Sequence, residues 1–220
     1  MAFQAILFDM DGLLGDTETL NNQAWQRAGA SLGYAIPAPL IDSTIGRNTA
    51  DTQQILQSAM GVDFPIEAVW DAKRQWVFDE MRTHGIPKMP WAEEALHSAR
   101  KAGLFIALAS STRREWVEER LLSLQWDTLF QAIACGDEVE ESKPNPAIFL
   151  LAASRLGILP ENCLVMEDSP AGLEAAHRAG IPCLWVPDRI GPQERPDCTK
   201  LAEGVFSNLQ EAMGWTLSRL

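Results

Sequence analysis

Short apolar runs that end in polar residues recur along the chain, and they predict its strands. The runs are residues 5–8, 104–109, 132–135, 163–166, 182–186 and 204–206. Such runs are typical of strands buried on both faces of a parallel sheet. Segments with helical spacing lie between them, at residues 91–101, 115–124, 146–156 and 170–179. The alternation predicts a doubly wound, Rossmann-like α/β fold, with a parallel sheet and helices on both of its faces.

The segment directly after the first strand has a different pattern, with helical spacing but no convincing strand. Its first helix is expected to begin at Asp16 or Thr17 and to end at Gly33. Pro37 and Pro39 mark a loop. Further helices are expected at residues 55–60 and 69–81. The chain thus leaves the sheet after a single strand to build an all-helical insert.

This interruption defines the predicted domains. Residues 1–15 and 88–220 are expected to form the α/β core, and residues 16–87 an inserted all-helical cap domain. A chain of 220 residues is long enough for one domain with a smaller insert.

Polar side chains gather where the predicted strands end. Asp9 and Asp11 follow the first strand with one residue between them, so they project from the same face. Other strand ends carry Ser110, Ser111, Glu167 and Asp168. Ligands of doubly wound sheets bind beyond the carboxyl ends of the strands. We therefore expect these side chains to converge on one site.

The chemistry of such a site follows from its oxygen donors, which suit a hard divalent cation such as Mg²⁺. A cation would also offset the repulsion between adjacent carboxylates. Asp9 could attack phosphorus to form an aspartyl phosphate, and Asp11 could exchange protons with the leaving alcohol and the attacking water. Ser110 and backbone N–H groups could hold phosphoryl oxygens, and Lys143 could neutralise developing charge.

Four short motifs occur in order along the chain. They are Phe8-Asp9-Met10-Asp11-Gly12-Leu13-Leu14, Leu108-Ala109-Ser110-Ser111, Ser142-Lys143-Pro144-Asn145-Pro146 and Val165-Met166-Glu167-Asp168-Ser169-Pro170-Ala171-Gly172. With these motifs and the helical insert, the sequence resembles the haloacid dehalogenase superfamily. Within it, the resemblance is to the phosphatases and phosphomutases that carry a helical cap after strand one. It covers essentially the whole chain, and four motifs in register argue against a chance match.

The resemblance implies roles for the acidic residues. Asp9 matches the family nucleophile, which is also a metal ligand. Asp11 matches the general acid/base, whose backbone carbonyl also binds Mg²⁺. Asp168 matches a metal ligand, and Glu167 matches either a direct ligand or an acceptor beside the metal.

Other implied roles concern the substrate. Ser110 matches the hydroxyl that binds the phosphoryl group, Ser111 contributes mainly its backbone, and Lys143 matches the charge-balancing lysine. In the cap, Arg47 looks like the arginine that reaches the distal part of the substrate. Asn21 stands where beta-phosphoglucomutases carry a cap histidine, and we count it among the substrate-binding residues.

These features predict a magnesium-dependent phosphatase that hydrolyses a small phosphomonoester, such as a sugar phosphate, through an aspartyl phosphate. A phosphomutase of the beta-phosphoglucomutase type shares the core motifs, but Asn21 cannot take up a proton as an imidazole can, which favours hydrolysis. A phospho-accepting regulatory domain of the receiver type also combines acidic residues, magnesium and a lysine on a doubly wound sheet. Such a domain has no use for the helical insert or for Asp11.

Charge and hydropathy limit the classes of binding partner that we expect for this chain. Acidic residues outnumber basic ones by 30 to 18, and the formal net charge of −12 disfavours a nucleic-acid partner. No apolar run reaches transmembrane length and no leader-like segment precedes the first strand. We expect a cytoplasmic monomer that acts on a small phosphorylated metabolite, away from membranes. The four cysteines have no Cys-x-x-Cys spacing and are expected to be reduced, mostly core residues.

Each motif also has a purely structural explanation. Serines after a strand can cap a helix, an acidic pair suits a helix N-terminus, and Lys143 can be a solvated loop residue. The functional interpretation prevails because all these explanations would have to coincide. Elsewhere packing is the better interpretation, for residues Trp25, Trp70, Trp76 and Trp116. Trp91 stands where many members of the superfamily have glycine, and the sequence offers no reason for it.

Overall fold

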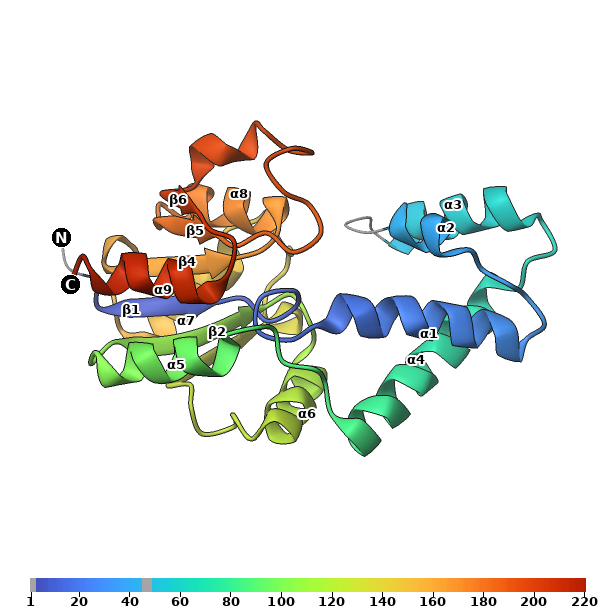
Figure 1. The fold of residues 1–220 in the computed structure, drawn as a ribbon, viewed down its shortest axis with the longest axis horizontal. Coiled ribbons are helices and arrows are strands. Elements are labelled where there is room, and N and C mark those ends of the chain that lie inside the picture. Colours follow the sequence, from blue (N-terminus) through green and yellow to red (C-terminus); the bar gives the residue numbers. More distant parts are fainter. Residues whose placement is uncertain (1–2, 45–48) are drawn as a thin grey trace. The chain divides into compact units, whose positions relative to one another are not determined.

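The computed structural model describes residues 3–44 and 49–220 of the chain (Figure 1). The chain divides into two compact units. The core unit comprises residues 1–16 and 86–220, and the helical unit comprises residues 17–85. The predicted domain boundaries lie within two residues of these divisions. That the two units serve as catalytic core and cap stays a prediction.

A parallel sheet forms the centre of the core unit, with six strands among the described residues. The strands are β1 (Ala5–Phe8), β2 (Phe105–Ser110), β3 (Ala132–Cys135), β4 (Cys163–Glu167), β5 (Cys183–Trp185) and β6 (Gly204–Val205). Their order is β3-β2-β1-β4-β5-β6, and every neighbouring pair is parallel. The strand order therefore changes direction beside β1, at the type of switch point where doubly wound sheets bind ligands.

The register of the three central strands brings their polar ends to one edge. Phe8, the last residue of β1, pairs with Leu108 in β2 and with Met166 in β4. β2 ends two residues later at Ser110, and β4 ends one residue later at Glu167. The predicted site residues of separate motifs therefore lie side by side at this edge of the sheet.

Helices cover both faces of this sheet. They are α5 (Ala92–Lys101), α6 (Arg114–Leu124), α7 (Ala147–Leu156), α8 (Pro170–Arg178) and α9 (Leu209–Leu217), with short 3-10 turns η1 (Gly136–Glu138), η2 (Pro160–Asn162) and η3 (Cys198–Leu201). On one face α7 packs on β1, β2 and β3, and α8 packs on β4 and β5. α5 packs on β2 and against α9.

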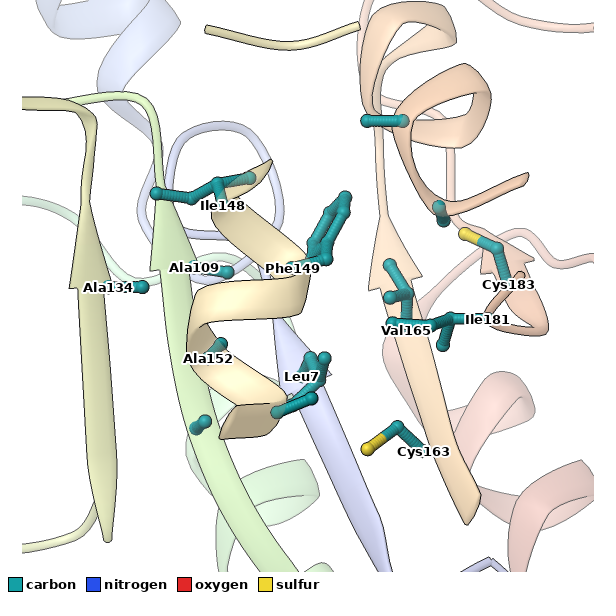
Figure 2. Close-up of a cluster of buried hydrophobic side chains, with 14 of the residues drawn as sticks. Leu7, Ala109, Ala134, Ile148, Phe149, Ala152, Cys163, Val165, Ile181 and Cys183 are labelled. Atoms are coloured by element: carbon teal, nitrogen blue, oxygen red, sulfur yellow. The ribbon is translucent and has the colours of Figure 1, made fainter. Parts of the chain in front are cut away.

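The buried cluster under α7 shows how the strands separate their two faces. Ile148 and Phe149 of α7 lie over strands that carry Leu7, Ala109 and Val165 (Figure 2). Small residues on these strands let the helix approach closely, because alanine leaves room for its side chains. Alternate residues of β1, such as the fully buried Phe8, face the other side of the sheet. Both faces are covered, so the predicted fold class is confirmed.

The helical unit has its own small core. Its helices are α1 (Thr17–Ser31), α2 (Ala38–Asp42), α3 (Thr49–Met60) and α4 (Ile66–His84), with no strand among its described residues. α1 packs along α4. Trp25 is buried in the core and Trp70 packs against it, with ring centroids 5.0 Å apart and an interplanar angle of 87°. The packing interpretation of these two tryptophans is confirmed.

Two helices were absent from the sequence prediction. α2 occupies a segment predicted as a loop from Pro37 and Pro39; this was wrong, because proline is tolerated in the first turn, whose N–H groups have no partner within the helix. α9 has a local signal that was not used. Its N-cap Asn208 accepts a hydrogen bond from the Glu211 N–H, which is a typical helix start.

Two further expectations concern cysteines and membranes. The residues Cys135, Cys163, Cys183 and Cys198 are all free and buried, as predicted. Over the described ranges, no helix has both the length and the apolar character that crossing a membrane requires.

Candidate active site

The loop after β1 is tightly folded and begins with Asp9. The Asp9 N–H donates to the Met166 carbonyl at 3.1 Å, which extends the β1–β4 pairing by one residue. Gly12 has φ +85°, and an ideal Cβ there would lie 2.4 Å from Asp168 Oδ2. Only glycine avoids both the backbone strain and this contact. Gly12 therefore lets the Asp168 carboxylate lie directly against the loop.

Lys143 joins two buried carboxylates. Its Nζ donates to Asp9 Oδ1, to Glu167 Oε1 at 2.6 Å and to the Ala109 carbonyl at 3.0 Å. The three N–H donors of an ammonium group are thereby used. The Lys143 side chain is only 6% exposed, so this ion pairing takes place away from bulk water. Three segments that are far apart in the sequence meet at this one amine.

The Glu167 carboxylate is fixed from both sides. Oε1 accepts from Lys143, and Oε2 accepts from the Ser169 N–H and Oγ, each at 2.9 Å. Glu167 is fully buried, and an ideal Cβ on Gly172 would lie 1.9 Å from its carboxylate. The first turn of α8 therefore provides the space as well as the donors that hold this side chain.

Burial and neighbouring charges move the pKa values of the site. Burial raises the pKa of Asp9 to about 7, with Lys143 opposing this change and Glu167 adding to it. Burial and then Glu167 raise the pKa of the Asp168 carboxyl well above its usual range. Burial opposes the charge on Lys143, but attraction to Asp9 and Glu167 outweighs burial and its pKa lies above the ordinary value. Three carboxylates around one ammonium favour a further cation.

Asp9, Glu167 and Asp168 form an acidic cluster that fits a metal ion. Each residue offers one carboxylate oxygen, and these atoms lie within 4.8 Å of one another. A set of oxygen donors suits Mg²⁺. The Asp11 side chain is not part of this cluster.

Asp11 is held by different donors. Its Oδ1 is ion-paired with Arg120 Nη1, and its Oδ2 accepts from Thr112 Oγ1 at 2.9 Å and from Ser110 Oγ at 3.3 Å. The Asp11 side chain is 31% exposed, against 9% for Asp9. The two aspartates that follow β1 thus have distinct surroundings, Asp9 buried against an ammonium and Asp11 partly exposed between a guanidinium and two hydroxyls.

The end of β2 supplies a hydroxyl and a backbone segment. Ser110 is fully buried, and its Oγ accepts from the Thr112 N–H at 3.1 Å. Ser111 is exposed, and its carbonyl oxygen would lie 2.0 Å from an ideal Cβ on Gly136. The Gly136 N–H donates to the Thr112 carbonyl at 2.9 Å. The turn after β3 therefore supports the segment that follows β2.

The structure brings together most of the residues predicted from the sequence. Those that converge at this edge of the sheet are Asp9, Asp11, Ser110, Lys143, Glu167 and Asp168, with Ser111 adjoining them. Asn21 lies in α1 of the helical unit and is half-buried. Arg47 lies outside the described residues.

Sequence reasoning missed Thr112 and Arg120. Thr112 directly follows the Ser110-Ser111 pair and carried no signal of its own. Arg120 carried a signal that was not used, because it falls in the helical stripe of the buried Val117 and Leu121. A charged residue on the buried face of a helix indicates a partner inside the protein.

Known proteins resemble this chain over most of its length. The family model described as haloacid dehalogenase-like hydrolase matches residues 6–186. A phosphorylated carbohydrates phosphatase of Thermotoga maritima is 35% identical over 186 residues, which cover 83% of this chain and 84% of the relative.

Solved structures show the same fold. A candidate beta-phosphoglucomutase from Thermotoga maritima has a TM-score of 0.85 and 29% identity, covering 99% of this chain and 100% of that one. A variant of CbbY from Rhodobacter sphaeroides, in complex with xylulose 1,5-bisphosphate, has a TM-score of 0.75 and 28% identity, with 95% and 96% covered.

Proposed function

The chain belongs to the haloacid dehalogenase-like hydrolase family and is a phosphatase, and on this premise we propose that it hydrolyses a small phosphomonoester of the sugar phosphate class with Mg²⁺ and through an aspartyl phosphate. One observation carries the proposal. A buried lysine joins Asp9 to Glu167, beside a cluster of carboxylate oxygens that fits Mg²⁺.

Asp9 is the nucleophile in this proposal. Lys143 holds Oδ1 and so orients the carboxylate, and the ammonium charge lies where phosphoryl oxygens gather negative charge. A bond forms between an Asp9 oxygen and phosphorus while the bond from phosphorus to the alcohol oxygen breaks. Ser110 Oγ and backbone N–H groups of the segment after β2 bind the phosphoryl oxygens.

Asp11 carries the proton in both half-reactions. It gives a proton to the departing alcohol oxygen, and it then takes one from the water that attacks the phosphorus of the aspartyl phosphate. The second attack breaks the bond between phosphorus and Asp9 and releases inorganic phosphate. The distinct surroundings of the two aspartates support this division of roles.

Asp9 and Asp168, with the Asp11 backbone carbonyl, are the residues that would hold Mg²⁺. Both Glu167 oxygens already have donors, so we assign Glu167 to orienting Lys143. The bound ion would offset the repulsion between the carboxylates and an anionic phosphoryl group.

The substrate class rests on the relatives. One relative is a phosphorylated carbohydrates phosphatase, and CbbY was solved with a sugar bisphosphate. The helical unit acts as a cap in this proposal, with Asn21 and Arg47 contacting the part of the substrate beyond the phosphate. The proposed site is made for a small metabolite, in agreement with the acidic net charge of the chain.

The test is phosphate release from para-nitrophenyl phosphate and from glucose 6-phosphate, with Mg²⁺ and after its removal by EDTA. We expect activity to depend on Mg²⁺. Asp9→Asn should lower kcat by a factor of about 10³ or more, because an amide cannot form the acyl phosphate. Asp127→Asn, at an exposed position of the core unit, is the control and should keep full activity. Unchanged turnover in Asp9→Asn would refute the proposal.

A second candidate is a phosphomutase, which the similarity to the candidate beta-phosphoglucomutase favours. The same enzyme preparation should be incubated with glucose 1-phosphate and a trace of glucose 1,6-bisphosphate. Hydrolysis predicts phosphate release that exceeds formation of glucose 6-phosphate. Conversion to glucose 6-phosphate without phosphate release would make the chain a mutase.

A further inference from the structure

The ion pair between Arg120 and Asp11 has no role in the proposed reaction steps. Arg120 lies on α6 among residues of its buried stripe, and its side chain is only 12% exposed. Its Nε is buried and has no hydrogen-bond partner among the described residues. A buried guanidinium is costly without a counter-charge. The Asp11 carboxylate supplies this counter-charge, so the arginine and the aspartate fix each other.

Thr112, which also donates to Asp11, is held in place by further hydrogen bonds. Thr112 Oγ1 lies 2.9 Å from Asp11 Oδ2 and 3.4 Å from Arg120 Nη1, so it links the two residues. The Thr112 carbonyl is itself anchored by the Gly136 N–H. A carboxylate held at both oxygens by anchored donors has a defined plane as well as a defined position.

The donors on the two oxygens differ in what they permit. A guanidinium can only donate, so Oδ1 must remain an acceptor while Arg120 is bound. The hydroxyls of Thr112 and Ser110 can donate or accept, so Oδ2 can carry a proton and keep its hydrogen bonds. The two oxygens of Asp11 are therefore not equivalent.

We infer that Arg120 is a positioning residue, which holds Oδ1 of Asp11 so that Oδ2 is the atom that delivers the proton to the leaving alcohol. The inference rests on the proposed function, because Arg120 acts only through Asp11 as general acid. It contacts neither Asp9 nor the acidic cluster in any interaction of the described residues.

The test compares substrates whose leaving groups differ in their need for a proton. Nitrophenolate departs without one, whereas the sugar alkoxide of glucose 6-phosphate needs one. The ratio kcat/KM covers binding and the first phosphoryl transfer, before the shared hydrolysis of the aspartyl phosphate. We expect Arg120→Met to lower kcat/KM for glucose 6-phosphate by about tenfold or more, and that for para-nitrophenyl phosphate by no more than about twofold. Arg120→Lys should recover part of the loss.

Three controls make the outcome decisive. Arg195→Met removes an exposed, ion-paired arginine of the same unit and should change neither ratio. Arg120→Met should have no further effect on the substrate ratio in an Asp11→Asn background, because the two changes remove one function. Thermal unfolding shows whether each variant is folded. If Arg120→Met does not fold, Arg120→Lys carries the same comparison with a smaller expected effect.

Equal losses on both substrates, additive losses with Asp11→Asn, or no loss at all would overturn the inference. These outcomes differ from failure of the proposed function. In that case the unmodified protein would release no phosphate, or Asp9→Asn would stay active, whatever the behaviour of Arg120 variants.

Discussion

The core unit and the helical unit each hold a lysine away from bulk water, Lys143 almost fully and Lys73 in part, and the two amines have opposite surroundings. Lys143 of the core unit faces Asp9 and Glu167, and its pKa lies above the ordinary value. Lys73 of the helical unit lies over the indole rings of Trp25 and Trp70, 4.9 and 5.7 Å from their centroids. Burial lowers the pKa of Lys73 to about 8, and the attraction of Glu18 opposes this only in part.

The difference shows that burial alone does not set the charge of a lysine. Two carboxylates more than offset the loss of water around Lys143. Two aromatic faces attract the ammonium of Lys73 through cation–π contact, which is weaker than an ion pair and offsets less. A permanent charge suits a site that binds an anionic phosphoryl group. In the helical unit, whose centre is an apolar cluster, the charge is a burden on stability.

The largest expected effect comes from removing the charge from the core unit. Lys143→Met leaves Asp9 and Glu167 buried without their shared cation, which should lower the free energy of unfolding by about 3–5 kcal/mol. Activity should fall by a factor of about 10² or more, because charge on the transferring group is no longer neutralised. Urea unfolding followed by circular dichroism, in EDTA, measures the stability.

Repeating the stability measurement of Lys143→Met with Mg²⁺ tests whether the loss comes from the missing positive charge. An added cation should restore part of the stability of Lys143→Met, because it supplies positive charge to the same carboxylates. Lys101→Met, at an exposed position of α5, is the matched control and should unfold like the unmodified protein. A Lys143→Met protein as stable as this control would mean that the buried carboxylates do not depend on the amine.

A smaller effect should follow when the lysine is kept and one partner is displaced. An alanine Cβ at Gly172 would overlap the Glu167 carboxylate, so Gly172→Ala should push Glu167 away from Lys143. We expect a loss of about 1–3 kcal/mol in the free energy of unfolding, and an activity loss smaller than that of Lys143→Met. Gly214→Ala on α9 has open space and should be neutral or stabilising by up to about 1 kcal/mol. Equal behaviour of the two variants would show that Glu167 is not confined by α8.

The polar cluster around Lys143 could be predicted from the sequence for a physical reason. In a parallel sheet, residues that follow neighbouring strands meet at one edge, so Asp9, Ser110 and Glu167 had to lie close together. The partners of Asp11 were harder to predict. Arg120 comes from the middle of a helix, and only the three-dimensional packing of α6 shows which strand end it reaches.

The backbone conformation of Trp91 could not be predicted from its residue type. The structure gives it φ +66°, in the left-handed region that favours glycine. A tryptophan in this position gives no hint of a left-handed backbone. The surroundings of Lys73 could not be predicted either. The sequence indicates that Trp25 and Trp70 are packing residues, but not that a lysine amine lies over their rings.

The smallest and most specific effect concerns Lys73 and pH. Its folded-state pKa of about 8 lies below the ordinary value of 10.5, so between these values the unfolded chain binds more protons than the folded protein. Stability from this group should therefore rise as pH increases from about 8 to 10.5, and Lys73→Met should lack that rise. We expect the difference between the two proteins to change by about 1–2 kcal/mol, less than the full shift implies because the residue is only half-buried. Urea midpoints from tryptophan fluorescence at pH 7.5 and 10 measure it, with Lys101→Met as the control. If the stability difference between the unmodified protein and Lys73→Met is the same at both pH values, the two indole rings stabilise the ammonium as well as carboxylates do.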